Sequence, residues 1–190
     1  MKIILASKSP RRRELISRIF SEFEIVTAET DETLPEGMHP GRGVEVLAVR
    51  KGEAVLPLVA DDALVISSDT LVEIDGIALG KPCDEADALR ILSLLSGRVH
   101  RVHTGVAVHY RGRVFSGVDT AQVKFKPFSN EEAVEYIKTG EPMDKAGAYA
   151  IQGIGARLVE KYDGDFNAIV GLGLNLTKRL INAAVENDKK

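Results

Sequence analysis

The 190-residue sequence has few aromatic residues, no tryptophan and a single cysteine. That cysteine, Cys83, excludes an internal disulfide and is typical of a protein in a reducing compartment. No apolar run approaches the roughly 18 residues that suggest a membrane span, and the N-terminus has no long apolar signal core. The formal net charge of −3 does not favour a protein that coats nucleic acid. We therefore expect a soluble, cytoplasmic protein.

Several common site motifs are also missing. The sequence contains neither the Gly-x-x-x-x-Gly-Lys-[Ser/Thr] phosphate loop nor the Gly-x-Gly-x-x-Gly dinucleotide fingerprint. His100 and His103 lie three apart on an expected strand and should face opposite sides, which argues against a zinc site. Cys83 has no histidine or second cysteine nearby, so a buried or incidental thiol is expected and not a nucleophile.

Apolar periodicity and turn residues predict alternating strands and helices in a single domain spanning residues 1–190. Strands are expected at 3–6, 22–29, 63–68, 71–79 (a hairpin turning at 75–76), 102–110, 114–118 continuing through 122–128, and 157–162. Helices are expected after residue 10 and at 47–58, 84–95, 129–140 and 174–185, with loops at 30–43 and 141–155. Asp84 is the expected N-cap of the helix 84–95, and Ser129 with Glu132 forms the capping-box pattern at the start of the helix 129–140. Because several strands form hairpins, the sheet should be mixed.

The first dozen residues contain the strongest local signal. A short apolar run is followed at once by Ser7, Ser9, Pro10 and three arginines that begin at Arg11. A strand leading directly into a helix directs free N–H groups and a positive dipole end at one point, where serine and arginine side chains suit a phosphate. An N-cap serine, a proline at the first helical position and solvated arginines explain the same residues without a ligand. Both interpretations are open at this point.

Further polar candidates lie at expected strand ends, in loops or on helix faces: Glu32, Lys51, Asp69-Thr70 and Lys81. Asp69 has apolar neighbours on both sides, and partial desolvation raises the affinity of a carboxylate for a metal or a proton. A turn aspartate bonded to its own backbone is the alternative. Lys81, beside a proline, is by itself typical of a solvated lysine.

Taken in order, these motifs resemble the Maf family of nucleoside triphosphate pyrophosphatases, which are related in fold to the inosine triphosphate pyrophosphatases. The resemblance rests on Leu5-Ala6-Ser7-x-Ser9-Pro10-Arg11-Arg12, Lys51, Asp69-Thr70, Gly80-Lys81-Pro82 and Glu141-Pro-Met-Asp-Lys-Ala-Gly-Ala-Tyr-Ala-Ile-Gln-Gly153. The first and last motifs are specific, and their joint occurrence in this order is not expected by chance. The resemblance implies an α/β fold with a mixed, elongated, twisted sheet flanked by helices, and two lobes around a central cleft.

The resemblance also implies the reaction and the roles of individual residues. Water would attack the α-phosphorus of a nucleoside triphosphate, giving the monophosphate and pyrophosphate. Asp69 would be the general base, or a metal ligand that positions the water, and Glu32 would join it in holding Mg²⁺ or Mn²⁺. The substrate phosphates would be bound by Ser7, Arg12, Lys51 and Lys81.

Substrate choice is implied by Arg11, Thr70 and Gln152, which match the branch of the family acting on dTTP and UTP and not the branch acting on 7-methylguanosine triphosphate. Ser67-Ser68 stand where the family often has Gly-Ala, and Gly52 follows Lys51 where alanine is common. Neither departure removes a charged group, but both leave the shape of the pocket and the ranking of pyrimidine nucleotides open.

Two other classes of function are open. Maf relatives are linked to arrest of septum formation, so the protein could regulate cell division through a partner surface such as the acidic loop 30–36 or the tail 186–190. Solvated surface explains both segments equally well. Nucleic-acid binding through Arg11–Arg13 and Arg18 is disfavoured, because these arginines do not all share one helix face and the net charge is negative. A homodimer is expected from the resemblance only.

Overall fold

The computed structural model of the chain describes residues 1–186. Its elements in chain order are β1 Ile3–Leu5, α1 Pro10–Ser17, β2 Glu24–Ile25, α2 Pro40–Glu53, η1 Leu56–Leu58, β3 Leu64–Ile74, β4 Ile77–Leu79, α3 Glu85–Leu95, β5 Val99–Tyr110, β6 Arg113–Phe125, α4 Asn130–Ile137, η2 Glu141–Asp144, η3 Ala146–Ala148, η4 Ile154–Leu158, β7 Val159–Asp163, α5 Phe166–Val170 and α6 Leu174–Glu186. No helix among them has both the length and the apolar character needed to cross a membrane.

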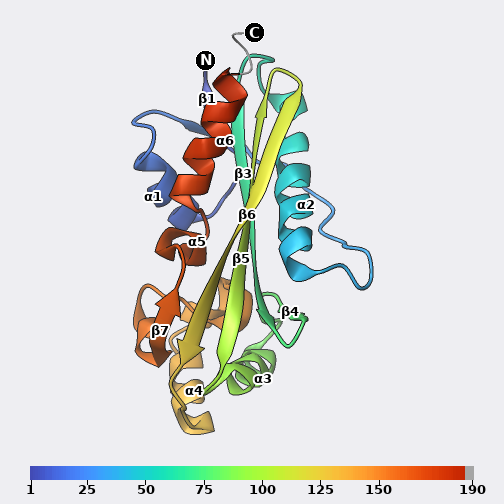
Figure 1. The fold of residues 1–190 in the computed structure, drawn as a ribbon. Helices are drawn as coiled ribbons and strands as arrows, with labels where there is room; N and C mark the ends of the chain where they lie inside the picture. Colours follow the sequence, from blue (N-terminus) through green and yellow to red (C-terminus); the bar gives the residue numbers. More distant parts are fainter. Residues whose placement is uncertain (187–190) are drawn as a thin grey trace.

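The seven strands form one mixed sheet in the order β2-β1-β3-β5-β6-β7, with β4 paired to β3. The β1 strand runs parallel to β2 and β3, whereas the other pairs are antiparallel. Figure 1 shows that the long strands β3, β5 and β6 span the whole elongated molecule. The helices α1, α5 and α6 lie toward one end, and α3, α4 and β7 lie toward the other. The predicted mixed, twisted sheet with two lobes is confirmed.

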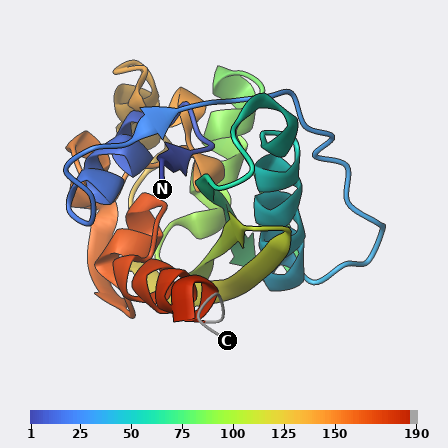
Figure 2. The same ribbon diagram turned by 90° about the horizontal axis from the view of Figure 1, so that it is seen from above.

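The α2 helix packs unusually close to the sheet, on the side opposite α5 and α6 (Figure 2). Glycine makes this approach possible, because a Cβ on Gly105 of β5 would lie 2.3 Å from the carbonyl oxygen of Val44. The neighbouring Thr104 faces the other way and donates its hydroxyl to the carbonyl of Ala168 in α5, at 2.8 Å. Adjacent residues of β5 therefore pack against different helices. The close contact between Gly105 and Val44 also brings the end of α2 against the middle of β3.

Two predicted boundaries are wrong in ways that matter for the site. The β3 strand continues from Leu64 to Ile74, whereas the sequence suggested one strand over 63–68, followed by Asp69, and a separate strand from residue 71. Asp69 pairs with Gly105 in an unbroken ladder along β5, so backbone pairing extends through the polar residues. The α2 helix begins at Pro40 and not near residue 47, because His39 Nδ1 accepts the amide of Gly41 and caps its N-terminus.

Other local predictions are confirmed. The β3–β4 hairpin turns at Asp75 and Gly76, both with positive φ. Ser129 and Glu132 form the expected capping box at the start of α4. Other predictions differ from the structure: β2 contains only two residues of the expected 22–29, α2 ends at Glu53 and not at 58, the expected loop 141–155 contains the short helices η2 and η3, and the short helix α5 was not anticipated. Cys83 is exposed, so of the two predicted alternatives the incidental thiol applies.

Candidate active site

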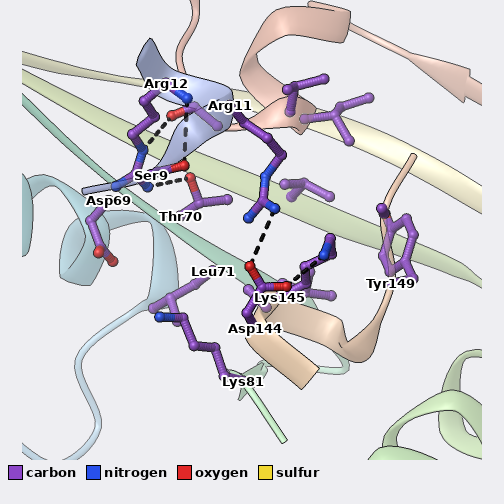
Figure 3. Close-up of a pocket in the computed structure, with 18 of the residues that line it drawn as sticks. Ser9, Arg11, Arg12, Asp69, Thr70, Leu71, Lys81, Asp144, Lys145 and Tyr149 are labelled. Carbon is purple, nitrogen blue, oxygen red and sulfur yellow. Dashed lines mark hydrogen bonds and ion pairs between the residues drawn. The ribbon is translucent and has the colours of Figure 1, made fainter. Parts of the chain in front are cut away.

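A cavity of about 510 Å³ lies where the two lobes meet, a size suited to a small-molecule ligand. Its walls come from α1, the middle of β3, the end of α2 and the segment that follows α4 (Figure 3). The expected site residues that line it are Arg11, Arg12, Glu32, Lys51, Asp69, Thr70, Lys81 and Gln152. Ser7 lines an adjoining hollow that shares several of these residues. The structure thus brings together every residue that the resemblance implied.

Arg12 is held in place by acceptors from three parts of the chain. Its Nε donates to the carbonyl of Gly171 at 2.9 Å, and its terminal nitrogens donate to Thr70 Oγ1 at 3.2 Å and to Ser7 Oγ at 3.4 Å. Burial lowers the pKa of the Arg12 guanidinium, and the nearby Asp69 carboxylate opposes this shift. Since an arginine stays protonated despite such a shift, the cavity contains a fixed positive charge.

The start of α1 confirms the capping interpretation of the serine-arginine motif and also faces the site, so that the phosphate interpretation stays a prediction. Ser9 is the N-cap and accepts the amide of Arg12 at 3.4 Å, with Pro10 in the first helical turn. Ser7 accepts the amide of Ser9 at 3.2 Å and turns its hydroxyl toward the hollow. The helix is therefore well capped, and the same residues form one wall of the site. Arg13 is exposed, as expected of a solvated arginine.

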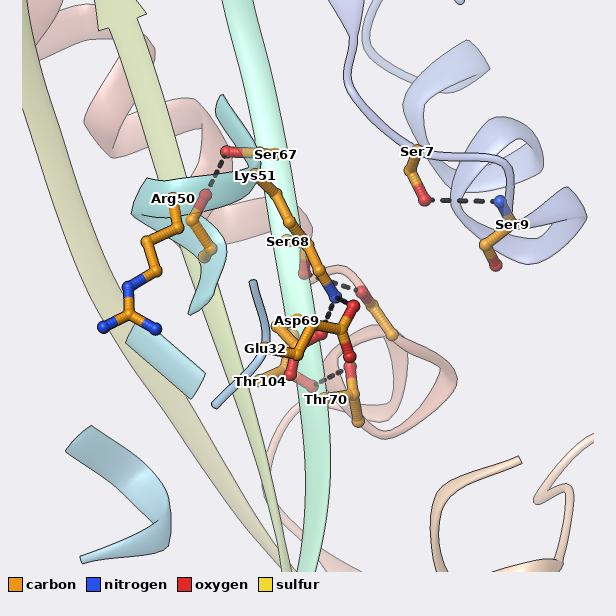
Figure 4. Close-up of polar contacts among 12 residues, drawn as sticks. Ser7, Ser9, Glu32, Arg50, Lys51, Ser67, Ser68, Asp69, Thr70 and Thr104 are labelled. Carbon is orange, nitrogen blue, oxygen red and sulfur yellow. Dashed lines mark hydrogen bonds and ion pairs between the residues drawn. The ribbon is translucent and has the colours of Figure 1, made fainter. Parts of the chain in front are cut away.

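Lys51 connects the two candidate metal ligands (Figure 4). Its Nζ pairs with Asp69 Oδ1 and, at 2.8 Å, with Glu32 Oε1. Asp69 is buried in β3, whereas Glu32 comes from the exposed loop before α2. Lys51 near the end of α2 therefore holds both carboxylates at one ammonium group, and Arg50 of the same helix donates to the backbone carbonyls on either side of Glu32.

The carboxylates of Asp69 and Glu32 fit a divalent ion whose other ligands are the phosphates of a bound molecule. Within residues 1–186, no group of three or more histidine, cysteine or acidic side chains is arranged to hold a metal alone. Asp69 and Glu32 nevertheless direct oxygens at one point, the position of the Lys51 ammonium. Mg²⁺ is commonly held by one or two carboxylates together with substrate phosphates. These two residues suit that arrangement.

An ion-pair chain crosses the mouth of the cavity. Arg11 of α1 lies 3.5 Å from Asp144 of η2, which pairs in turn with Lys145 at 2.5 Å. Lys145 Nζ also donates to the carbonyl of Glu141 at 2.6 Å. Lys81, on the opposite wall, has no hydrogen bond or ion pair with any described residue that would restrain its ammonium group.

Comparison with known proteins assigns the family. A family model described as Maf-like protein matches residues 2–184. The chain belongs to this family. The dTTP/UTP pyrophosphatase of Bacillus velezensis is 46% identical over 180 residues, which cover 95% of each chain. The protein of the same name from Vibrio cholerae is 46% identical over 181 residues, covering 95% of this chain and 97% of its own.

The fold of this Maf-like protein also occurs in a solved structure of low sequence identity. The solved structure of the Staphylococcus aureus Ham1 protein superimposes with a TM-score of 0.52 at 14% sequence identity. The match covers 97% of this chain and 91% of that chain. At this level of identity the likeness concerns the fold alone, and it agrees with the architecture that the motifs implied.

The two departures from the Maf pattern lie behind the cavity and not in its wall. A Cβ on Gly52 would lie 2.3 Å from His109 Nε2 and 2.8 Å from Ser67 Oγ, so the glycine makes room for both side chains. Ser67 donates to the carbonyl of Ala48 in α2 at 2.6 Å, and Ser68 donates to that of Gly171 at 3.0 Å. Gly52 and Ser67 therefore affect packing between α2, β3 and β5, whereas Ser68 holds from behind the same Gly171 carbonyl that accepts Arg12 in the cavity wall.

The roles implied by the resemblance left out four residues that line or support the cavity, although three of them stand in the quoted motif 141–153. Asp144, Lys145 and Tyr149 line the cavity, and His100 supports Tyr149 through a 2.9 Å contact between its Nε2 and the phenol oxygen. The signal for the first two was present, because a charged pair inside a glycine- and alanine-rich loop is unusual. Nothing in the sequence indicated that His100 and Tyr149 would meet, since 49 positions separate them.

Proposed function

We propose that the protein hydrolyses dTTP and UTP to the nucleoside monophosphate and pyrophosphate. The observation that carries this proposal is the convergence of Arg12, Lys51 and Lys81 with a buried carboxylate, Asp69, on one cavity. Transfer of a phosphoryl group depends mostly on positioning and on neutralising charge on phosphate oxygens. The relatives named above supply the substrate class.

In this proposal Ser7, Arg12, Lys51 and Lys81 bind the triphosphate. Arg12 already has its orientation fixed by Gly171 and Thr70, so it needs no rearrangement to meet a phosphate. Lys81, which is unrestrained, adapts its position to the bound ligand.

The Lys51–Asp69 pair suggests how the base becomes available. A triphosphate competes with the two carboxylates for the Lys51 ammonium, because it carries more negative charge. Once Lys51 turns to the phosphates, Asp69 accepts a proton from the attacking water. The water oxygen forms a bond to the α-phosphorus, the bond to the bridging oxygen breaks, and pyrophosphate departs with its electron pair.

Asp69 and Glu32 would hold the divalent cation, Mg²⁺ or Mn²⁺. Such an ion, when bound, neutralises charge on phosphate oxygens and lowers the pKa of a bound water. Arg11, Thr70 and Gln152 would recognise the base. A side-chain amide such as that of Gln152 offers both a donor and an acceptor to a pyrimidine edge.

The test is pyrophosphate release from a panel of nucleoside triphosphates that includes dTTP, UTP, CTP and purine nucleotides, each with Mg²⁺ and with Mn²⁺. Asp69→Asn should lower kcat by at least about 10²-fold, because it removes the proton acceptor without changing shape. Asp62→Asn, at an exposed carboxylate outside the cavity, is the matched control and should leave kcat unchanged.

Three outcomes would count against the proposal. Activity confined to purines would refute the choice of substrate, and an Asp69→Asn variant as active as the parent would refute the mechanism. Release of no pyrophosphate from any nucleotide would refute the enzyme itself and favour a cell-division regulator. For that role the acidic loop 30–36 is within the described structure, whereas residues 187–190 of the tail lie outside it.

We also propose that residues 1–190 act as one pyrophosphatase domain, which the family match over residues 2–184 supports. A homodimer and a cytoplasmic location stay predictions. Sedimentation of the purified protein measures the first, and cell fractionation measures the second.

A further inference from the structure

The segment that carries Gln152 is fixed from behind by a partly buried set of polar groups. Glu141, the first residue of η2, accepts three hydrogen bonds with its carboxylate. Its Oε2 accepts the Tyr136 hydroxyl at 2.6 Å and the Gly155 amide at 2.8 Å, and its Oε1 accepts the Ile154 amide at 3.0 Å. Hydrogen bonds to a charged group are stronger than those between neutral groups. The carboxylate therefore fixes the backbone immediately after Gln152.

Tyr136 fixes the backbone on the other side of Gln152. This tyrosine of α4 is fully buried, and its hydroxyl oxygen accepts the Ala150 amide at 3.1 Å while its proton goes to Glu141. Burial raises the pKa of the phenol, so it remains a donor. Burial alone would raise the pKa of Glu141 as well, but the Tyr136 hydroxyl and the two amides outweigh it and lower that pKa, so the carboxylate stays ionised.

The two glycines that follow Gln152 are required by the close approach of Glu141 and Tyr136. Gly153 has φ of +98°, and a Cβ there would lie 2.3 Å from Glu141 Oε1. A Cβ on Gly155 would lie 2.4 Å from the Tyr136 hydroxyl. Both positions need glycine because the carboxylate and the phenol occupy the space that a side chain would fill.

Gln152 itself lines the cavity, and its side-chain amide forms no hydrogen bond with any described residue. The backbone on either side of Gln152 therefore sets where its side chain starts and the direction in which it enters the cavity. We propose that Glu141, with Tyr136, is a positioning residue that fixes Gln152 against the nucleotide base and so determines which base the enzyme accepts. This inference rests on the proposed pyrophosphatase activity.

The test compares Glu141→Gln, Tyr136→Phe, Gln152→Ala and the double variant Glu141→Gln/Gln152→Ala. An amide at position 141 has one acceptor atom in place of two, so one backbone N–H must face an NH₂ group. The ratio of kcat/KM for dTTP to that for CTP should fall roughly tenfold in Glu141→Gln, mainly through KM. Glu135→Gln, on the exposed side of α4, is the control and should keep the parental ratio.

Two further measurements separate positioning from general damage. The double variant should be no worse than Gln152→Ala, since residues acting through one group are not additive. The inhibition constant of inorganic tripolyphosphate, which carries no base, should stay within about twofold of the parent's in every variant. Tyr136→Phe should also lower the ratio of kcat/KM for dTTP to that for CTP. This variant tests the positioning role if Glu141→Gln does not fold.

Each failure has its own meaning. A parent enzyme that cleaves nucleotides while the position 141 and 136 variants keep its substrate ratio overturns the positioning role and leaves the proposed function intact. Weaker tripolyphosphate binding in step with the loss of nucleotide turnover also overturns it, because the whole site has then collapsed. A parent that cleaves no nucleotide overturns the proposed function and this inference together.

Discussion

Acid should destabilise the protein in part through His100, a buried histidine that supports the wall of the cavity. His100 is 1% exposed, and its Nε2 lies 2.9 Å from the hydroxyl of Tyr149, a cavity residue. Its other ring nitrogen has no partner among residues 1–186. Burial lowers the pKa of His100 to about 4, with no charged group contributing. The imidazole is therefore neutral in the folded protein.

The direction and size of the effect follow from the two pKa values. In the unfolded chain the histidine has a pKa of about 6.5, so below that pH the unfolded state binds a proton that the folded state does not. Stability from this group is complete above pH 6.5 and is lost as the pH falls toward 4. At about 1.4 kcal/mol per pH unit the full loss is roughly 3.4 kcal/mol, of which about 1.8 kcal/mol falls between pH 7 and pH 5.

Urea unfolding at pH 7 and pH 5 measures this directly. The parent should lose about 1.8 kcal/mol more unfolding free energy over this interval than His100→Gln, which cannot titrate. His39→Asn is the control: it removes an exposed imidazole and keeps a helix-capping side chain, so its loss should equal the parent's. The burial of His109, which also lowers its pKa, affects all three proteins equally. A His100→Gln variant that loses as much stability as the parent would falsify the argument.

Three shorter predictions concern the site and its support. Arg12→Lys should lower kcat/KM by roughly 10²-fold, because an ammonium group cannot reproduce the guanidinium fork that contacts three acceptors. Steady-state kinetics measures this, and an unchanged kcat/KM would contradict the prediction. A chelator should abolish pyrophosphate release and added Mg²⁺ or Mn²⁺ should restore it; full activity in the chelator would contradict the metal assignment. Gly52→Ala should lower the free energy of unfolding by about 1–3 kcal/mol, because the added Cβ clashes with His109. Gly80→Ala is the control and should change the free energy of unfolding little, because a Cβ there contacts nothing. Equal effects of the two substitutions in urea titrations would refute the packing explanation.

Local sequence signals were reliable where a few neighbouring residues decide the structure. The capping box at Ser129, the positive-φ turn at Asp75-Gly76 and the Asp84 cap of α3 all form as predicted. The sequence did not predict the start of α2, because Gly41 and Gly43 would weaken an isolated helix. In the folded protein these glycines let the helix pack closely against His103 and Leu34. Asp69 looked like a strand end because a carboxylate is rare within a buried strand, but pairing along β5 keeps it inside one.

By itself, the sequence determined the family, the alternation of strands and helices, and the identity of the charged residues that the structure brings to one cavity. These follow from short motifs whose members are close in the chain, such as the serine-arginine start of α1. Only the tertiary structure decided what these residues do to one another. The Lys51 contact with Asp69 and Glu32, the Arg11–Asp144 pair across the cleft and the support of Gln152 by Glu141 and Tyr136 join separate elements. Such contacts depend on how helices and strands pack, and packing is settled by close backbone approaches that no local pattern encodes.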